Sequence, residues 1–317
     1  MKLAIGVITY NDSSIKYLPD FLGSLLEALN GLESVEWQIL VRDNSEQENN
    51  PNKDYFNNLT SKDHISFIWS GANLGFAKAY NLMISDAKEW GADYFLMINP
   101  DIFIKPNAIL EMLAAINNDQ KIASVTPKIL RWDFANKKFT NYIDSCGLSI
   151  GSGLVFRDIG QGRVDDGSFD KSSIIGASGA AALFRMSALE DIKDDNGYLD
   201  EEMFMYKEDC DLAYRLFLKG YKSILVPQAI IYHDRSVSAV SQGLIGSIKS
   251  RKDKNKLVKS WSFLNQHLLI IKHWHAQNFK SKILILLRLI PLWGYAIVFE
   301  PFLLKNCLII KKKIAKK

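Results

Sequence analysis

Short apolar runs alternate with amphipathic segments along the first half of the chain. The runs of strand length are residues 3–9, 37–41, 65–69 and 94–98. The segments with helical spacing of apolar residues, or with helix-start signals, are 18–29 (ended by Gly31), 76–90 and 106–117. Strands that alternate with helices predict an α/β fold with a doubly wound, mainly parallel sheet.

The second half is less regular. Many glycines between residues 130 and 184 predict hairpins. The next predicted elements are a helix over 207–219, ended by Gly220, and strands over 223–226 and 229–232. Because the composition changes after Ser236, we expect a catalytic domain over 1–240 and a helical region over 241–317, with the boundary within 238–247.

Composition narrows the class of protein. The chain has 317 residues, of which 48% are hydrophobic, enough for a packed core and too many for disorder. Its three cysteines are far apart in sequence and favour neither a zinc site nor a disulfide framework, which suits a reducing compartment. The first apolar run is too short for a signal peptide, and we interpret it as a strand.

Charge is distributed unevenly. Residues 249–317 carry 16 Lys and Arg against two acidic residues, a net charge of +14, which leaves −10 for residues 1–248 and gives +4 in total. Within this tail, the apolar stretch 283–310 is interrupted by charges and prolines, so it lacks the roughly 20 uninterrupted apolar residues of a clean membrane span. We expect interfacial helices on an anionic membrane surface. The alternative is a helical subdomain that packs on the catalytic domain or on a second copy of the chain.

Polar residues follow three of the predicted strands. They are Thr9 and Asn11, Asp43 and Asn44, and Asn99 and Asp101. Ligands of open α/β sheets bind at the carboxyl ends of the strands, so this convergence predicts a site. Asp101 can hold Mg²⁺ or Mn²⁺ against a diphosphate leaving group, and a simple Asn-Pro-Asp turn is an equal alternative on spacing alone.

The helix after residue 207 begins with clustered acids. Helical spacing places Asp209 on the apolar face, where burial would raise its pKa and make it a competent general base. Glu208 is explained by the helix dipole. Asp211 and Arg215 are four residues apart and can pair on the flank of the helix.

Three further segments have both a functional and a structural explanation. The loop 71–81 opens a helix and can present free N–H groups to a phosphate, or it can be a plain cap. His233 follows a strand and can be a metal or phosphate ligand, or a packed histidine. The small residues of 176–185 allow the close approach of a substrate or of another part of the chain.

Five motifs occur in an order that resembles the family 2 glycosyltransferases with the GT-A fold, most closely their rhamnosyltransferase-like branch. They are residues 3–11, 41–45, 73–77, 98–101 and 208–215, and the resemblance covers about residues 1–240. It implies an inverting transfer of a sugar, with dTDP-L-rhamnose as the expected donor, to a glycan or lipid-linked saccharide acceptor in cell-surface polysaccharide synthesis.

The resemblance also implies roles for individual residues. The implied nucleotide-binding residues are Thr9, Tyr10, Asn11, Asp43, Asn73, Gly75, Phe76 and Asn99. Asp101 and His233 are the implied ligands of Mg²⁺ or Mn²⁺, and Asp209 is the implied base. Glu208, Asp211 and Arg215 are expected either to contact the acceptor or to contact and support the residues that do.

The sequence also leaves alternative functions to consider. The donor can be another UDP- or dTDP-sugar. A nucleotidyltransferase is disfavoured because Tyr10–Ser13 stands where a glycine-rich loop should follow the first strand. A non-catalytic membrane scaffold is disfavoured by the presence of both Asp101 and Asp209. The expected location is cytoplasmic, peripheral on the inner face of the cell membrane, with no nucleic-acid partner.

Overall fold

A single nine-stranded sheet forms the centre of the protein. The computed structural model describes residues 1–60, 63–235 and 255–315. The strands are β1 (Lys2–Thr9), β2 (Glu36–Asp43), β3 (Ile65–Trp69), β4 (Tyr94–Ile98), β5 (Ile102–Ile104), β6 (Ile122–Asp133), β7 (Lys138–Ser145), β10 (Ala181–Arg185) and β11 (Lys222–His233), and a separate hairpin joins β8 (Leu148–Gly151) to β9 (Val155–Asp158). The helices of this body are α1 (Asn11–Ile15), α2 (Leu18–Asn30), α3 (Pro51–Asn57), α4 (Gly75–Trp90), α5 (Ala108–Asn117), α6 (Met186–Ile192) and α7 (Glu208–Leu218).

The sheet is mainly parallel, as predicted. Its order is β3-β2-β1-β4-β10-β6-β11-β5, with β7 paired to β6. The pairs β1–β2, β2–β3, β1–β4 and β6–β11 are parallel, whereas β10 lies antiparallel between β4 and β6. The two strands predicted after residue 222 are one strand, β11, with a register shift between Val226 and Ile230. The short β5 was not predicted.

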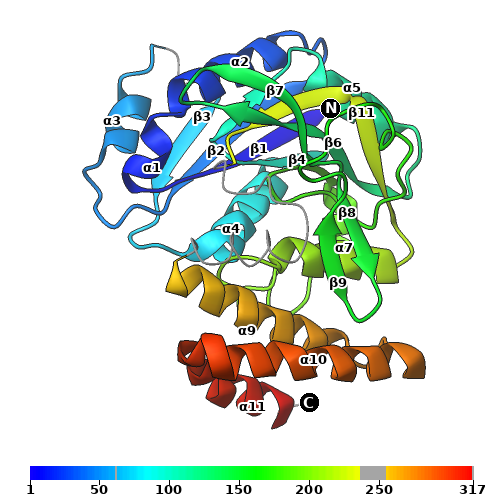
Figure 1. The fold of residues 1–317 in the computed structure, drawn as a ribbon. Coiled ribbons are helices and arrows are strands. Elements are labelled where there is room, and N and C mark those ends of the chain that lie inside the picture. The colour runs from blue at the N-terminus through cyan, green and yellow to red at the C-terminus, as the bar shows by residue number, and fades with distance from the viewer. Residues whose placement is uncertain (61–62, 236–254, 316–317) are drawn as a thin grey trace.

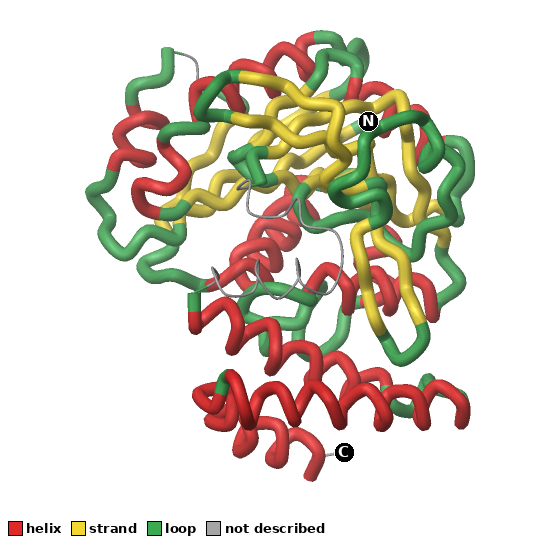
Figure 2. Tube along the Cα trace, in the orientation of Figure 1, coloured by secondary structure: helices red, strands yellow, loops and turns green. Residues whose placement is uncertain are grey.

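Helices cover both faces of the sheet, which confirms the doubly wound arrangement (Figure 2). Alternate residues of β1 point to opposite faces: Ile5 packs in the core formed with α2 and α5, whereas Ala4 packs in the core formed with α4 and α6. Because β10 is antiparallel to both β4 and β6, the carboxyl ends of β1, β2, β4 and β11 all lie at one edge of the sheet.

The C-terminal helices form a stack beneath the body in Figure 1. They are α9 (Lys256–His273), α10 (Phe279–Phe299), the 3-10 helix η1 (Pro301–Asn306) and α11 (Cys307–Ala315). Leu269 and Ile270 of α9 belong to a core shared with α7 and the β8–β9 hairpin, and Phe263 of α9 belongs to a second core shared with α10, η1 and α11.

The interruptions noted in the tail do not break α10. It is one continuous helix of 21 residues that runs through Pro291. By length and composition alone this helix could cross a membrane, so the interruptions by themselves do not exclude a span. The boundary expected within 238–247 lies outside the described residues.

Candidate functional site

A cavity of about 1020 Å³ opens at the carboxyl edge of the sheet. Most of the residues predicted to form a site line it together: Tyr10, Asn73, Gly75, Phe76, Asn99, Asp101, Glu208, Asp209 and His233. They come from the ends of β1, β4 and β11 and from the starts of α4 and α7. The edge of the sheet therefore collects side chains that are more than 200 residues apart in sequence.

Thr9 and Asp43 lie behind the cavity and do not face it. They are paired in the register of β1 and β2, and the Thr9 hydroxyl donates to the Asp43 carboxylate at 2.7 Å. Asp43 also accepts hydrogen bonds from Ser45 (2.8 Å) and Asn50 (2.8 Å), and it is fully buried. Asp43 thus fixes the loop after β2, whose Asn44 does line the cavity, and its direct contact with a nucleotide stays a prediction.

Asn11 also ties this loop in place. Its backbone N–H donates to the Ser45 hydroxyl at 2.7 Å, and its side-chain oxygen accepts from the backbone N–H of Glu46 at 3.1 Å. Asn11 adopts a positive φ of 41°, a conformation that asparagine tolerates better than most residues. Asn11 is not among the lining residues, and its contact with a nucleotide stays a prediction.

The loop before α4 is shaped by contact with the chain around residue 204. Gly75 has a φ of +76°, and a Cβ built on it would lie 2.4 Å from the carbonyl oxygen of Phe204. The same carbonyl accepts the N–H of Phe76 at 2.7 Å, so this helix N-terminus is partly occupied by protein. Asn73 caps the turn by accepting the Gly75 N–H at 3.0 Å.

A second group of charged residues surrounds His233. Its Nδ1 lies 2.8 Å from Asp144 and its Nε2 lies 3.3 Å from Asp101. Arg235 contacts Asp144 at 3.1 Å and Asp158 at 3.4 Å. Burial alone would lower the pKa of His233, but the two carboxylates Asp101 and Asp144 raise it to about 10. The imidazole is therefore held between two acids at the wall of the cavity.

Asp144, Asp158 and Arg235 were not predicted as site residues. All three line the cavity. Burial raises the pKa of Asp158, whereas bonds from His233 and Arg235 outweigh burial and lower the pKa of Asp144. Arg235 stands two residues after His233, and that adjacency was a usable signal. Asp144 and Asp158 lie in the irregular region, where nothing in the sequence indicated their pairing with His233.

The cavity wall suits a divalent cation that is shared with a diphosphate. The buried Oδ1 of Asp101 accepts no hydrogen bond from any described residue, and the Nε2 of His233 lies 3.3 Å away from it. An oxygen and a neutral imidazole nitrogen are acceptable ligands for Mn²⁺ and, for the oxygen, Mg²⁺, so a bound Mn²⁺ would have to displace the proton that the raised pKa otherwise keeps on His233. Within residues 1–60, 63–235 and 255–315 there is no group of three or more His, Cys, Asp or Glu arranged around an ion, so substrate phosphates and water would complete the coordination.

The burial of Glu208 and Asp209, at the start of α7, differs from the prediction. Glu208 is the buried one, and no described residue gives a hydrogen bond to its Oε2. Burial raises the pKa of Glu208 well above its ordinary value, and the charge of Asp209 adds to the shift. Asp209 is only partly buried, and its carboxylate accepts the N–H groups of Gly179 (3.3 Å) and Cys210 (2.8 Å). The expectation of a buried Asp209 was wrong because the side chain points into the open cavity.

Asp211 and Arg215 form the predicted pair, at 2.8 Å, but on a buried face of α7. Asp211 also contacts His273 at 2.7 Å and Lys272 at 3.1 Å, both from α9. Neither Asp211 nor Arg215 lines the cavity. The structure therefore places this pair between α7 and α9, outside the cavity, and not on an exposed flank.

The model of the family "Glycosyl transferase family 2" matches residues 4–193. The chain belongs to this family. It is a glycosyltransferase, and the predicted GT-A fold is confirmed.

Curated relatives of this glycosyltransferase include two kinds of rhamnosyltransferase. The N-acetylglucosaminyl-diphospho-decaprenol L-rhamnosyltransferase of Mycobacterium tuberculosis is 27% identical over 256 residues, covering 74% of this chain and 77% of that protein. Rhamnosyltransferase WbbL of Escherichia coli K12 is 28% identical over 247 residues, covering 73% and 86%. The glycosyltransferase is therefore rhamnosyltransferase-like in sequence.

Solved structures share its fold at low identity. GalNAc-T7, crystallised with UDP, GalNAc and Mn²⁺, has a TM-score of 0.56 at 13% identity, and the match covers 88% of this chain and about half (52%) of that one. TarS residues 1–349 of S. aureus match with a TM-score of 0.53 at 16% identity, covering 100% and 92%. The mannosyltransferase PcManGT of Pyrobaculum calidifontis, in complex with GDP-Man and Mn²⁺, matches at 0.50 and 14%, covering 99% and 86%.

Proposed function

We propose that this family 2 glycosyltransferase transfers a sugar from a nucleoside diphosphate donor, with dTDP-L-rhamnose as the expected donor, to a hydroxyl of a lipid-linked or glycan acceptor. Relatives named as rhamnosyltransferases support the donor, and the one named for a diphospho-decaprenol substrate supports a lipid-linked acceptor. The observation that carries the proposal is that Asp101, His233 and Asp209 line one cavity. Another UDP- or dTDP-sugar remains the alternative donor.

The diphosphate of the donor would bind at the wall formed by Asp101, His233 and Arg235. Arg235 places a permanent positive charge there, fixed by Asp144 and Asp158, which favours an anionic ligand. When Mg²⁺ or Mn²⁺ is bound, Asp101 and His233 would hold it, and the ion would neutralise charge on the departing nucleoside diphosphate. Tyr10, Asn44 and Asn99 line the adjacent part of the cavity, where the rest of the nucleotide would bind.

Asp209 is the proposed base. The acceptor oxygen forms a bond to the anomeric carbon while the bond from that carbon to the diphosphate oxygen breaks, so the configuration is inverted in one step. The acceptor hydroxyl gives its proton to the Asp209 carboxylate. The N–H groups of Gly179 and Cys210 fix that carboxylate, which keeps it oriented toward the cavity before the acceptor arrives.

The C-terminal helices are the proposed membrane contact. Several apolar side chains of α10 are more than half exposed: Leu286, Leu287, Ile290, Ile297, Val298 and Phe299. Lysines 311–313 of α11 follow them, so apolar and basic side chains are combined in one helical stack. This combination favours the inner leaflet of the cell membrane, where anionic lipids would attract the lysines.

Calorimetric titration with dTDP and with UDP, each with and without Mn²⁺ or Mg²⁺, tests the proposed function. We expect binding that the metal strengthens, that prefers dTDP, and that loses its metal dependence in Asp101→Ala. The matched control is Asp195→Ala, which removes an exposed aspartate outside the cavity and should bind as the wild type does. A preference for UDP would favour the alternative donors. Absence of binding to either nucleotide would support a non-catalytic scaffold.

A further inference from the structure

The backbone that leads into α7 is held in an unusual conformation. Tyr206 and Lys207, directly before Glu208 and Asp209, have φ angles of 73° and 77°. Two successive non-glycine residues in the left-handed region are unfavourable, and they persist only where the surrounding structure holds them. The position of the Asp209 carboxylate depends on this turn, because α7 begins at the next residue.

Helix α9 supplies a clamp for this turn. The side-chain amide of Asn265, which is buried, donates to the carbonyl oxygens of Met205 at 2.8 Å and Tyr206 at 2.7 Å. One amide nitrogen thus satisfies two successive carbonyl groups of the strained turn. These two hydrogen bonds join the turn directly to α9, in addition to the packing between them.

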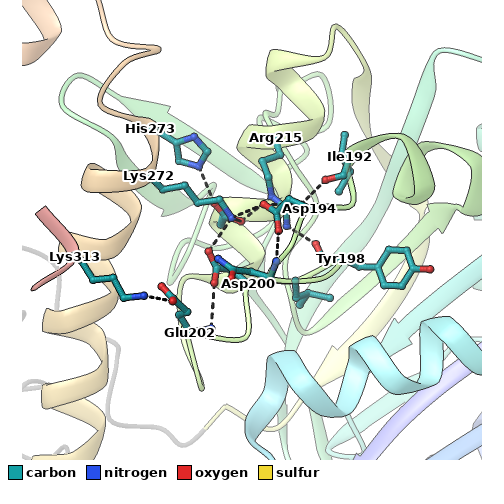
Figure 3. Close-up of polar contacts among 12 residues, drawn as sticks. Ile192, Asp194, Tyr198, Asp200, Glu202, Arg215, Lys272, His273 and Lys313 are labelled. Atoms are coloured by element: carbon teal, nitrogen blue, oxygen red, sulfur yellow. Dashed lines mark hydrogen bonds and ion pairs between the residues drawn. The ribbon is translucent and has the colours of Figure 1, made fainter. Parts of the chain in front are cut away.

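A second contact holds both ends of the same segment. Lys272 of α9 lies 2.8 Å from Asp200 and 3.1 Å from Asp211, and His273 lies 2.7 Å from Asp211. Figure 3 shows Lys272 and His273 reaching from α9 toward the loop that carries Asp194 and Asp200. Asp200 precedes the strained turn and Asp211 follows it, so α9 brackets the turn with charged contacts.

Burial would raise the pKa of Asp211, but the hydrogen bond from His273 and the charges of Arg215 and Lys272 lower it below the ordinary range. The carboxylate is therefore ionised when it meets α9. Helix α4 also supports the segment: Asn81 bonds the backbone of Leu199, and Phe76 bonds that of Phe204. Neither reaches residues 205–207.

Helix α9 also forms part of the cavity. Leu257, Val258, Trp261 and Ser262 line it, and the ring of Trp261 lies 4.9 Å from the ring of Phe204. In addition, Lys313 of α11 forms an ion pair with Glu202 (Figure 3). The C-terminal helices are thus in contact with the segment 200–211 at several points along its length.

We propose that α9 is a positioning element of the transfer reaction: Asn265, with Lys272 and His273, holds residues 205–211 so that Asp209 faces the cavity. The inference rests on the proposed role of Asp209 as base and adds residues outside the matched family region, which ends at residue 193. It makes the C-terminal region part of the machinery for turnover and not only an attachment to a surface. Asn265, Lys272 and His273 act through Asp209 and need not touch the substrate.

The test compares two isosteric substitutions on α9 and its neighbour. Asn265→Asp replaces the donating amide by a carboxylate, which cannot donate to the two carbonyls. Asn306→Asp makes the same change in a buried amide of η1 that donates to Ser260 on α9 at 3.1 Å. We expect kcat to fall about 10- to 100-fold in Asn265→Asp and to stay within about 2-fold in Asn306→Asp. The Kd for the nucleotide should change less than about 2-fold in both variants, because neither substitution changes the proposed diphosphate-binding residues Asp101, His233 and Arg235.

A pair of His273 variants keeps the test decisive if Asn265→Asp does not fold. His273→Leu removes the bond to Asp211, whereas His273→Gln keeps a donor on a side chain of similar reach. A loss of kcat in His273→Leu that His273→Gln partly restores, at unchanged nucleotide Kd, supports the inference. Equal losses of kcat in Asn265→Asp and Asn306→Asp, or wild-type kcat in both Asn265→Asp and His273→Leu, would overturn it.

Asp209→Asn, measured alongside, separates this inference from the proposed function. If Asp209→Asn keeps wild-type turnover, the role of Asp209 fails and the inference fails with it. If Asp209→Asn is inactive while the α9 variants turn over normally, only the inference fails.

Discussion

The Nδ1 of His233 lies 2.8 Å from the carboxylate of Asp144, which turns its Nε2 toward Asp101. Such a carboxylate–histidine pair fixes the orientation of an imidazole that binds a metal. The partner comes from β7, far from β11 in sequence, and reaches His233 because both strands pair with β6. Asp144 is thus the residue that determines whether His233 can act together with Asp101.

Asp144→Ala is expected to weaken Mn²⁺-dependent binding of the nucleotide about 10- to 100-fold, because His233 loses its orienting partner. Calorimetric titration with Mn²⁺ and dTDP measures this directly. Asp166→Ala, an exposed carboxylate outside the cavity, is the control and should bind as the wild type does. Unchanged metal-dependent binding in Asp144→Ala would show that His233 is oriented by other contacts.

Asp209→Asn should lower turnover by about 10²- to 10⁴-fold, the usual contribution of general acid–base catalysis. The amide keeps the shape of the side chain and cannot accept the proton of the acceptor. Nucleotide binding, measured by calorimetry, should stay unchanged because the residues proposed to bind the diphosphate are Asp101, His233 and Arg235. Wild-type turnover in this variant would remove Asp209 from the proposed mechanism.

Glu208→Gln should stabilise the protein at neutral and higher pH. The raised pKa of Glu208 means that the folded protein binds its proton more tightly than the unfolded chain does. Stability is therefore lost as the pH rises above the unfolded carboxyl pKa of about 4.3, through the folded-state value. Glutamine is always neutral and escapes this loss.

Thermal unfolding checks this prediction. The midpoint of Glu208→Gln should exceed that of the wild type at about pH 8, and the difference should disappear near pH 4. The same substitution at the exposed Glu33 should give no such pH-dependent difference. If Glu208→Gln raised the unfolding midpoint equally at both pH values, protonation of Glu208 would not explain the difference in stability.

Gly75→Ala should destabilise the protein more than Gly71→Ala does. Both glycines have a φ of +76°, so both substitutions carry the backbone cost of about 1–2 kcal/mol. Only at Gly75 does the new Cβ also meet protein, at 2.4 Å from the Phe204 carbonyl oxygen, whereas nothing lies within 4 Å at Gly71. The overlap should add about 1–3 kcal/mol. Urea unfolding of the two variants measures the difference, and equal free energies of unfolding would show that the segment at Phe204 moves aside at little cost.

The combined substitution Leu286→Ser and Ile290→Ser should reduce sedimentation with vesicles that contain anionic lipid, because both side chains are exposed on α10. Leu218→Ser, at an exposed leucine of α7 on the body, is the control. If α10 lies on the surface, high salt should release much of the wild-type protein, since the attraction of lysines to lipid is screened. Protein that is released only by detergent would indicate that α10 crosses the membrane. Wild-type sedimentation of the double variant would contradict a membrane contact through this face of α10.

Local patterns in the sequence were enough to predict the alternation of strands and helices, the parallel core of the sheet and the edge at which the site lies. Apolar periodicity and turn residues act over a few positions, so 3–9 and 94–98 could be recognised as strands and the polar residues after them as neighbours. The ordered motifs predicted the family for the same reason: each motif is contiguous in sequence.

Contacts between distant segments were decided only by the tertiary structure. Helical spacing does not predict that Glu208 is buried and that Asp209 faces the cavity. The orientation of these two side chains depends on the strained turn at 206–207 and on the residues that pack around that turn. The pairing of Asp144 with His233 depends on the register of β6, and the clamp of Asn265 on Tyr206 depends on the docking of α9. Burial and hydrogen bonding are properties of the assembled fold, and no local pattern specifies which residues will meet there.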